Sequence, residues 1–384
     1  MFDVYLPSTL SWVARLLPAL GGVEVSIGAP WMVHNRFFNP AYRHYPFPLQ
    51  RWLAPAPRTE FDFPLRQKLL TGMQRRLPLY PMWLERQLQR DPPDLLHAHF
   101  GTTACLYMDT ARRLNRPLAV TFYGFDYAKA PRLRPAYIAL YRQLFAGAQR
   151  VIAASEAGCR ALQNMGCPPG KLAIVPPGPQ LNAFPFSERK KTSGQLRLVQ
   201  VATITAKKGH LTALEAFRQA LPDCPGMEMT LAGERQDKTL AARLERFIRS
   251  HNLEDHVHMI DFVEHQAMSG FLKNFDAFIH PSCHTPDGDH EATPVVLLEA
   301  QASGLPVLCT DHFDLPAEVL HEHTGLVSPE GDTAALAGHI RRLYRMNEVD
   351  FAAMSKRARQ HVENHFNVLH SAARLREIYR EMLS

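Results

Sequence analysis

AFIHPSCHTPDGDHEATPVVLLEAQASGLPVLCT, at residues 277–310, contains one complete strand–helix–strand unit. The apolar run at 277–280 predicts a buried strand, and a second run at 306–309 predicts another. A polar, turn-forming loop separates the first strand from a helix, for which Thr293 is the expected N-cap and Pro294 the first helical residue. A strand, a helix and a strand in this order predict parallel strands joined by a crossover.

The same alternation runs along most of the chain. Further short apolar runs, each typical of a buried strand, stand at 94–99, 118–122, 151–155, 173–175, 196–202, 229–233 and 257–260. Apolar residues at helical spacing separate them, for example Leu211, Leu214 and Phe217. The pattern predicts an α/β protein with two doubly wound parallel sheets.

A turn-rich and then polar stretch marks a boundary near the middle of the chain. Pro176-Pro177-Gly178-Pro179 is followed by SERKKTSG at 187–194, a composition typical of an interdomain linker. We therefore expect a first domain at 1–182 and a second at 183–365. The amphipathic tail at 366–384 is expected to form a terminal helix that packs back on the first domain.

The composition excludes disordered and fibrous proteins. With 384 residues, of which 46% are hydrophobic and 21% charged, the chain has the composition and length of two globular domains. Its six cysteines include no CxxC pair, so neither a disulfide framework nor a cysteine zinc site is indicated. It has no run of about 18 apolar residues and no signal-peptide pattern. We expect a cytoplasmic protein, either free or peripheral at the inner face of the cell membrane.

Charge is unevenly distributed between the two halves. Residues 1–185 carry 21 Lys and Arg against 10 Asp and Glu, whereas residues 186–384 carry 22 against 27. The basic half predicts an anionic partner. No nucleic-acid-binding motif is present, so we expect no nucleic-acid partner. Basic residues interleaved with apolar ones at 66–90 suit a helix at an anionic membrane surface, and a solvated helix packed on its own domain is the alternative.

Ligands of open parallel sheets bind at the carboxyl ends of strands, which directs attention to the loop at 281–292. The first N–H groups of the following helix, those of Val295 and Val296, suit a phosphate because they lack helical partners. Glu299 is placed to bind the hydroxyls of a ribose, and Glu291, before the helix, a second polyol. The pattern predicts a nucleotide-sugar site; two surface glutamates beside an ordinary capped helix are the alternative.

A second loop follows the expected strand at 196–202 and contains Lys207-Lys208-Gly209. Lysine beside glycine at a strand-to-helix turn suits a pyrophosphate, because the ammonium is a compact charge and glycine permits close backbone approach. Solvated lysines are the alternative. Two such loops at one sheet edge support each other.

Several motifs together resemble the family 4 glycosyltransferases, which are retaining enzymes of GT-B fold. They are HEATPVVLLEAQASGLPVLCT at 290–310, Lys207-Lys208-Gly209, LAGE at 231–234, FIHPS at 278–282 and DLLHAHFG at 94–101. The resemblance implies two Rossmann-like domains that face a central cleft. It also implies transfer of a sugar from a nucleoside-diphosphate sugar to an acceptor hydroxyl, on a sugar or a lipid-linked acceptor. Surface polysaccharide, lipopolysaccharide or glycolipid would be the product.

The resemblance implies a role for each matching residue of the second half. Glu299 would bind the nucleotide ribose, Glu291 the transferred sugar and Lys208 the diphosphate. The same donor site would include Thr203, Gly233, Thr293, Val295 and Val296.

Two residues of the first half also match the family. His99 matches a histidine that faces the donor sugar, and Asp126 of YGFD at 123–126 matches an HGxD loop on the acceptor side. We expect His97 and His99 to lie on opposite faces of their strand, so that one of them faces the cleft.

The chain departs from the family pattern at four places. Thr203 replaces an arginine that partners the lysine, Ala292 replaces a glycine, and Tyr123 replaces the histidine of HGxD. The N-terminal glycine-rich loop is not evident, with Ser8-Thr9 and Gly21-Gly22 as candidates. A non-catalytic nucleotide-sugar-binding subunit and a GT-B-fold nucleotide-sugar epimerase therefore stay open as alternatives.

The expected mechanism uses no cofactor. A helix N-terminus and Lys208 would stabilise charge on the departing phosphate without a metal, and we expect front-face attack by the acceptor because no enzyme nucleophile is evident. We interpret Asp287-Gly288-Asp289 as an acidic turn rather than a metal site. His280, Cys283, His284 and His290 fit no standard zinc spacing.

Overall fold

The computed structural model describes residues 1–384 except 3, 6–10, 33–38, 49–78 and 190. The chain forms two compact units, one made of Met1–Pro176 with Val368–Ser384 and the other of Pro177–Asn367. The chain passes between the units inside the proline run at 176–179, whereas the predicted boundary is at 182. It returns to the first unit at Val368 rather than at residue 366.

The second unit contains one sheet of six parallel strands in the order β11-β10-β9-β12-β13-β14. The strands are β9 (Leu196–Val201), β10 (Met227–Ala232), β11 (Val257–Ile260), β12 (Ala277–His280), β13 (Val307–Thr310) and β14 (Gly325–Ser328). Numbered from its first strand this is the order 3-2-1-4-5-6 of doubly wound folds, whose topological switch point lies between β9 and β12. The predicted parallel α/β architecture is confirmed for this unit.

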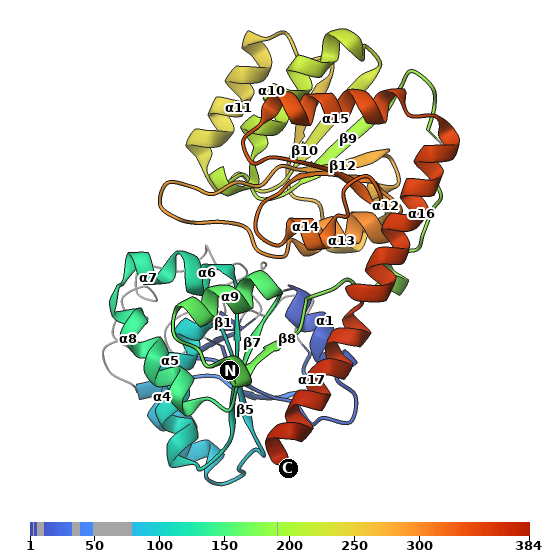
Figure 1. The fold of residues 1–384 in the computed structure, drawn as a ribbon. Helices are drawn as coiled ribbons and strands as arrows, with labels where there is room; N and C mark the ends of the chain where they lie inside the picture. The colour runs from blue at the N-terminus through green and yellow to red at the C-terminus, as the bar shows by residue number, and fades with distance from the viewer. Residues whose placement is uncertain (3, 6–10, 33–38, 49–78, 190) are drawn as a thin grey trace. The chain divides into compact units, whose positions relative to one another are not determined.

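Helices cover both faces of that sheet, as Figure 1 shows within the unit. One face packs against α10 (His210–Ala220), α11 (Lys238–Ser250) and α15 (Thr333–Arg345). The other packs against α12 (His265–Leu272), α13 (Val295–Ala302) and α16 (Glu348–His365). The shorter helices are η3 (Leu181–Ala183), η4 (Ala206–Lys208), η5 (Leu221–Asp223) and α14 (Leu315–Glu318). Successive side chains of β9 alternate between the two cores, since Leu198 joins one and Val199 the other.

The first unit contains a sheet of four parallel strands in the order β5-β6-β7-β8, and two parallel strand pairs, β1-β3 and β2-β4. The strands are β1 (Val4–Tyr5), β2 (Ser26–Gly28), β3 (Trp31–Met32), β4 (Arg43–Tyr45), β5 (Leu96–His99), β6 (Leu118–Phe122), β7 (Arg150–Ala153) and β8 (Leu172–Ile174). The helices are α1 (Ser11–Ala19), α4 (Leu79–Leu88), α5 (Gly101–Arg113), α6 (Gly124–Ala128), α7 (Ala130–Leu133), α8 (Ala136–Gly147), α9 (Glu156–Asn164), η2 (Pro169–Lys171) and α17 (Val368–Leu383).

The terminal helix α17 belongs to the first unit because its apolar side chains complete a core there. Leu375, Ile378 and Met382 recur at helical spacing and are buried together with Val13 and Leu16 of α1. Full burial of one such side chain contributes roughly 1.5–3 kcal/mol. This helix also lies against β5, where the hydroxyl of Tyr379 is 2.6 Å from Nδ1 of His97.

The basic segment proposed for a membrane surface lies mainly outside the described residues, and so does Ser8-Thr9. Its described end, α4, buries Tyr80, Leu84 and Leu88 in its own unit and leaves Arg86 exposed. Among the described residues, no helix is both long and apolar enough to cross a membrane.

Candidate functional site

The candidate site lies where the loops after β9 and β12 meet, at the switch point of the second sheet. β9 pairs directly with β12, with Leu198 opposite Ala277 and Val199 opposite Phe278. Because both strands run in the same direction, the loops that leave their carboxyl ends emerge side by side. Polar residues of the two loops are therefore brought together although they are far apart in the sequence.

Gly209 allows the loop after β9 to approach the loop after β12. It ends η4 in the left-handed conformation, with φ of +68°, and a Cβ there would lie 1.8 Å from the carbonyl oxygen of Pro281. Only glycine avoids this collision. The loops are also joined by a hydrogen bond from the N–H of Cys283 to the carbonyl of Lys207, at 2.9 Å.

Both lysines of the first loop form ion pairs with the second. The ammonium of Lys208 pairs with the carboxylate of Glu291, and both side chains are largely buried. Lys207 Nζ lies 3.1 Å from Oδ1 of Asp289. Burial, with a smaller contribution from the neighbouring Lys207, lowers the pKa of Lys208 to about 7, although Asp289 opposes this shift. Lys208 and Glu291 were predicted to lie in one site, and the structure places them in direct contact.

The helix α13 begins one residue later than expected. Its N-cap is Pro294 and its first residue is Val295, so the interpretation of Thr293 as the N-cap was wrong. Pro294 has extended backbone, and the hydroxyl of Thr293 instead lies 3.3 Å from Oδ2 of Asp314. No side chain caps this helix. The N–H groups of Val295 and Val296 therefore stand at an uncapped helix start.

Glu299 lies on α13 and its side chain is only 4% exposed. Its Oε1 is 3.1 Å from Nε2 of His265, the first residue of α12. His265 was not predicted as a site residue, because a lone histidine at the start of a helix carries no motif. The pairing restrains the carboxylate that is expected to bind a ribose.

Gly233 and Thr203 lie in neighbouring loops of the same sheet edge. A Cβ at Gly233 would come within 1.9 Å of the carbonyl oxygen of Ala202, so glycine permits the close contact of the two loops. The N–H of Ile204 donates to the carbonyl of Glu234 at 2.9 Å. The structure thus places Thr203 in the loop that carries Lys208, and Gly233 in the neighbouring loop.

The acidic turn at Asp287-Gly288-Asp289 is held by its own contacts. The N–H of Asp289 donates to Oδ1 of Asp287 at 3.3 Å, and Gly288 adopts a positive φ of 80°. A different group has metal-ligand spacing. Ligand atoms of His284, His312 and Glu330 lie within 4.8 Å of one another, and within the described part of the chain no second such group occurs.

The first unit holds His99 and Asp126. Nδ1 of His99 is 2.8 Å from the hydroxyl of Tyr123, the residue that replaces the family's histidine. Phe2 stacks on the ring of His99 with a centroid distance of 4.7 Å. The rings of His97 and His99 also stack, 4.4 Å apart. The expectation that they face opposite sides was wrong, because side chains two positions apart in a strand lie on the same face.

Asp126 is completely buried at the start of α6. Its Oδ2 accepts the N–H of Tyr123 at 2.9 Å, and its Oδ1 accepts the N–H of Thr102, in the first turn of α5, at 3.3 Å. Burial raises the pKa of Asp126 to about 7, although these backbone donors lower it. The carboxylate joins two helix starts and presents no exposed surface to an acceptor.

A doubly wound parallel sheet, with two lysines and an uncapped helix start at its switch point, defines a Rossmann-type protein. A family model described as glycosyl transferases group 1 matches residues 184–376, and one described as a glycosyl transferase 4-like domain matches residues 7–178. The chain belongs to the group 1 glycosyltransferases, and is a transferase.

Two relatives illustrate the similarity. The chain is 32% identical over 71% of its length to the Escherichia coli (strain K12) protein named for colanic acid biosynthesis, glycosyltransferase WcaL, of which 67% is covered. It is 31% identical over 81% of its length to the amylovoran biosynthesis glycosyltransferase AmsK of Erwinia amylovora, of which 76% is covered.

Solved structures share the fold at lower identity. Anabaena Alr3699/HepE in complex with UDP gives a TM-score of 0.75 at 15% identity, over 99% of both chains. Sucrose-phosphate synthase from Thermosynechococcus elongatus gives 0.75 at 20% identity, over 99% of this chain and 95% of that one. The predicted GT-B fold of two Rossmann-like domains is therefore confirmed.

Proposed function

We propose that the protein is a retaining glycosyltransferase that transfers a sugar from a nucleoside-diphosphate sugar to an acceptor hydroxyl in polysaccharide biosynthesis. The observation that carries this proposal is the contact between Lys208 and Glu291 beside the uncapped start of α13. These groups supply a cation, a carboxylate and free N–H donors at one sheet edge. A diphosphate joined to a polyol needs that combination.

The relatives support the biological setting and the donor class. WcaL and AmsK are named for colanic acid and amylovoran biosynthesis. Solved structures of the Anabaena protein hold UDP and UDP-glucose. The proposed partners of this chain are thus a nucleotide-sugar donor and a sugar or lipid-linked acceptor.

Five residues of the donor site have proposed roles. The carboxylate of Glu299, restrained by His265, would accept hydrogen bonds from the ribose hydroxyls. The N–H groups of Val295 and Val296 and the ammonium of Lys208 would bind the diphosphate. Glu291 would then exchange its pairing with Lys208 for the hydroxyls of the transferred sugar.

The proposed reaction needs no metal and no covalent intermediate. The bond between the anomeric carbon and the diphosphate oxygen breaks, and its electron pair stays on that oxygen, where Lys208 and the helix start stabilise the charge. The acceptor oxygen bonds to the anomeric carbon on the same face. Its proton passes to the departing diphosphate. Configuration at the anomeric carbon is retained.

Thermal shift measurements with UDP, GDP, ADP and their sugar conjugates test the donor site. We expect one nucleotide to stabilise the wild type, and Glu299→Ala to abolish that stabilisation with and without EDTA. Glu254→Ala is the matched control, because Glu254 is exposed in the turn that precedes β11, on the opposite edge of the sheet. Equal losses in both variants would contradict the assignment.

Product analysis separates the proposal from its alternatives. A new glycoside whose anomeric configuration matches that of the donor supports a retaining transferase, and an inverted product overturns that mechanism. Release of a free epimer without acceptor would identify an epimerase instead. Nucleotide binding without turnover across a broad acceptor panel would favour a non-catalytic subunit, the alternative that Thr203 and Ala292 raised.

A further inference from the structure

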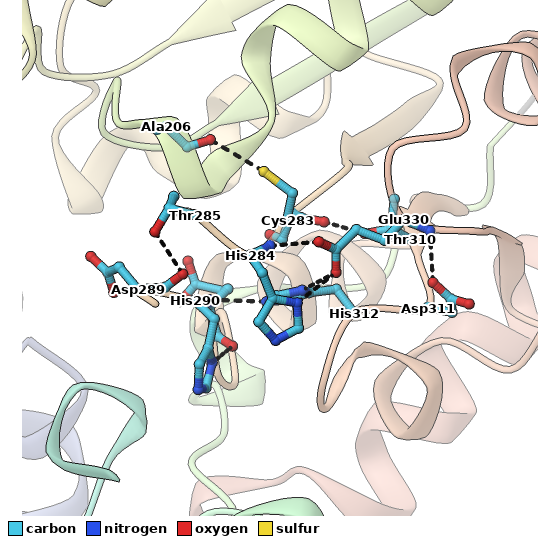
Figure 2. Close-up of polar contacts among 12 residues, drawn as sticks. Ala206, Cys283, His284, Thr285, Asp289, His290, Thr310, Asp311, His312 and Glu330 are labelled. Carbon is cyan, nitrogen blue, oxygen red and sulfur yellow. Dashed lines mark hydrogen bonds and ion pairs between the residues drawn. The ribbon is translucent and has the colours of Figure 1, made fainter. Parts of the chain in front are cut away.

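We propose that Glu330 and His312 form a hydrogen-bonded chain that positions Glu291 for donor binding and transfer. The inference rests on the proposed function and assigns a positioning role to two residues that no motif singled out. Figure 2 shows dashed contacts that join the carboxylate of Glu330 to His284 and His312. Nδ1 of His312 lies 2.8 Å from Oε2 of Glu330, and Nε2 of the same ring lies 3.1 Å from the backbone nitrogen of Glu291.

The geometry determines which nitrogen of His312 carries the proton. The backbone N–H of Glu291 can only donate, so Nε2 of His312 must accept. The ring proton therefore sits on Nδ1 and is donated to the carboxylate of Glu330. Burial lowers the pKa of His312, although the contact with Glu330 raises it, and the side chain is fully buried. Both observations agree with a neutral ring in one tautomer.

Glu330 is itself held in place. Its Oε1 accepts the backbone N–H of His284 at 2.6 Å, and its own N–H donates to Oδ1 of Asp311 at 2.8 Å. Oε2 is shared, since Nδ1 of His284 lies 2.9 Å from it. Burial raises the pKa of Glu330, but hydrogen bonds from His312 and His284 outweigh it and lower the pKa. The carboxylate is thus a fixed, ionised acceptor.

The hydrogen-bonded chain from Glu330 through His312 restrains the backbone of Glu291, and Lys208 restrains the side chain of Glu291. Residues 281–294 contain no helix or strand, so regular backbone hydrogen bonds do not fix the direction of the Glu291 side chain. A contact to its N–H limits the backbone dihedral angles from which that side chain projects. The arrangement resembles the acid–imidazole pairs that hold a catalytic group in one orientation, with a backbone N–H as the group held.

The same contacts satisfy the hydrogen-bonding groups of His312 and Glu330 without a metal. A metal on Nδ1 of His312 would move the ring proton to Nε2, where it would face the N–H of Glu291. Two donors would then oppose each other. We therefore assign His312 and Glu330 to positioning rather than to metal binding.

Glu330→Gln tests this chain with a change of one atom. The backbone N–H of His284 selects the amide oxygen for the Oε1 position, which leaves the amide NH₂ facing Nδ1 of His312. Nδ1 must then accept, so the proton moves to Nε2 and opposes the N–H of Glu291. We expect kcat to fall about 10- to 100-fold, as when hydrogen-bond partners that orient functional groups are removed, while the nucleoside diphosphate that stabilises the wild type stabilises this variant equally.

Two further variants make the test specific. His284→Ala removes a ring from the same carboxylate oxygen but keeps the backbone N–H, so kcat should change less than about twofold. His312→Gln supplies an amide oxygen that can accept the N–H of Glu291. A glutamine amide has no tautomers, so this contact no longer depends on Glu330. Adding Glu330→Gln to His312→Gln should therefore cause little further loss of kcat. Additive losses of kcat would overturn the proposed hydrogen-bonded chain.

Nitrogen-15 spectra of histidine-labelled protein in EDTA give a readout that does not depend on turnover. The His312 signal is identified as the one that disappears in His312→Gln. In the wild type this signal should show a proton on Nδ1, and in Glu330→Gln a proton on Nε2. A wild-type proton on Nε2 overturns the hydrogen-bonded chain, and a tautomer change with unaltered kcat overturns its positioning role. If the wild type binds no nucleotide and has no activity, the proposed function fails, and the positioning role fails with it. The spectra still test whether the hydrogen bonds between Glu330, His312 and Glu291 exist.

Discussion

The ammonium of Lys208 contacts the carboxylate of Glu291, although the two residues come from loops 83 positions apart in the sequence. The contact exists because β9 and β12 are adjacent and parallel and because Gly209 lets the two loops touch. A buried cation paired with one carboxylate is neutral as a unit. A diphosphate brings further negative charge, so donor binding is expected to draw Lys208 away from Glu291 and leave the carboxylate to the sugar.

Replacing Lys208 should therefore affect catalysis far more than replacing its neighbour. Lys208→Met removes the charge proposed to stabilise the departing diphosphate, and loss of one such group costs about 10²–10³ in kcat. Lys207→Met removes an equal charge from the same loop, where Lys207 pairs with Asp289, and should reduce kcat less than tenfold. Steady-state kinetics compare the two, and equal losses would count against the role of Lys208.

Lys208→Met should also destabilise the protein, because it leaves Glu291 largely buried without its cation. The double variant Lys208→Met with Glu291→Gln removes both charges and should recover most of that stability without recovering activity. Denaturant unfolding measures the first effect and turnover the second. Recovery of both would show that Lys208 acts only in folding.

Gly209→Ala should disrupt the contact between the two loops. An alanine Cβ would lie 1.8 Å from a carbonyl oxygen, and the alanine would have to adopt the left-handed conformation that glycine has there. Gly194→Ala is the matched control, since Gly194 has a similar φ of +75° but nothing nearer than 4.0 Å. The control should cost about 1–2 kcal/mol of stability, the conformational cost alone. Gly209→Ala should cost more and weaken nucleotide binding, as thermal shifts would report; equal costs would contradict the proposed crowding.

The sheet of the second unit could be predicted because its local and long-range signals agree. Apolar runs such as 277–280 and 306–309 are too short for helices and are separated by helical patterns, so parallel strands follow. The same logic brought Lys208 and Glu291 to one edge of the sheet. Strand order, which makes them direct partners, was supplied by the structure alone.

The remaining site residues depend on contacts that leave no local pattern. His265, His312 and Glu330 are ordinary residues in sequence, and only the folded chain brings them to Glu299 and Glu291. Thr293 was misassigned because a threonine before a proline carries the pattern of an N-cap, while the contact with Asp314 that it makes instead is long-range. His97 and His99 were misassigned by an error of periodicity, not by tertiary structure.

Tyr123→Phe tests whether the chain has replaced the family's histidine with a functional equivalent. The variant removes the hydroxyl 2.8 Å from Nδ1 of His99 and leaves the ring packed. If His99 serves the donor sugar, loss of this hydrogen bond, worth about 1 kcal/mol, should lower kcat roughly tenfold at most. Tyr137→Phe removes a hydroxyl from α8 as the control. An unchanged kcat for Tyr123→Phe would argue against an orienting role.

Asp126 supports a prediction about pH, because its fully buried carboxyl has a pKa raised from 3.8 to about 7. Between these values the folded protein keeps a proton that the unfolded chain has lost, so stability from this group is complete below about pH 4 and is lost as pH rises through 7. The shift corresponds to roughly 4 kcal/mol over that window. Asp126→Asn does not titrate, so the stability of wild type relative to this variant should fall as pH rises.

Thermal unfolding of both proteins between pH 4 and pH 8 measures that difference, with Asp109→Asn as the same substitution at an exposed position of α5 for comparison. The same variants separate a structural from a catalytic role for Asp126. The carboxylate accepts N–H groups at the starts of two helices, whereas asparagine offers one oxygen, so Asp126→Asn should lower the unfolding midpoint. Well below that midpoint its kcat should stay near that of wild type. A lost kcat with an unchanged midpoint would instead return Asp126 to the acceptor site that its motif implied.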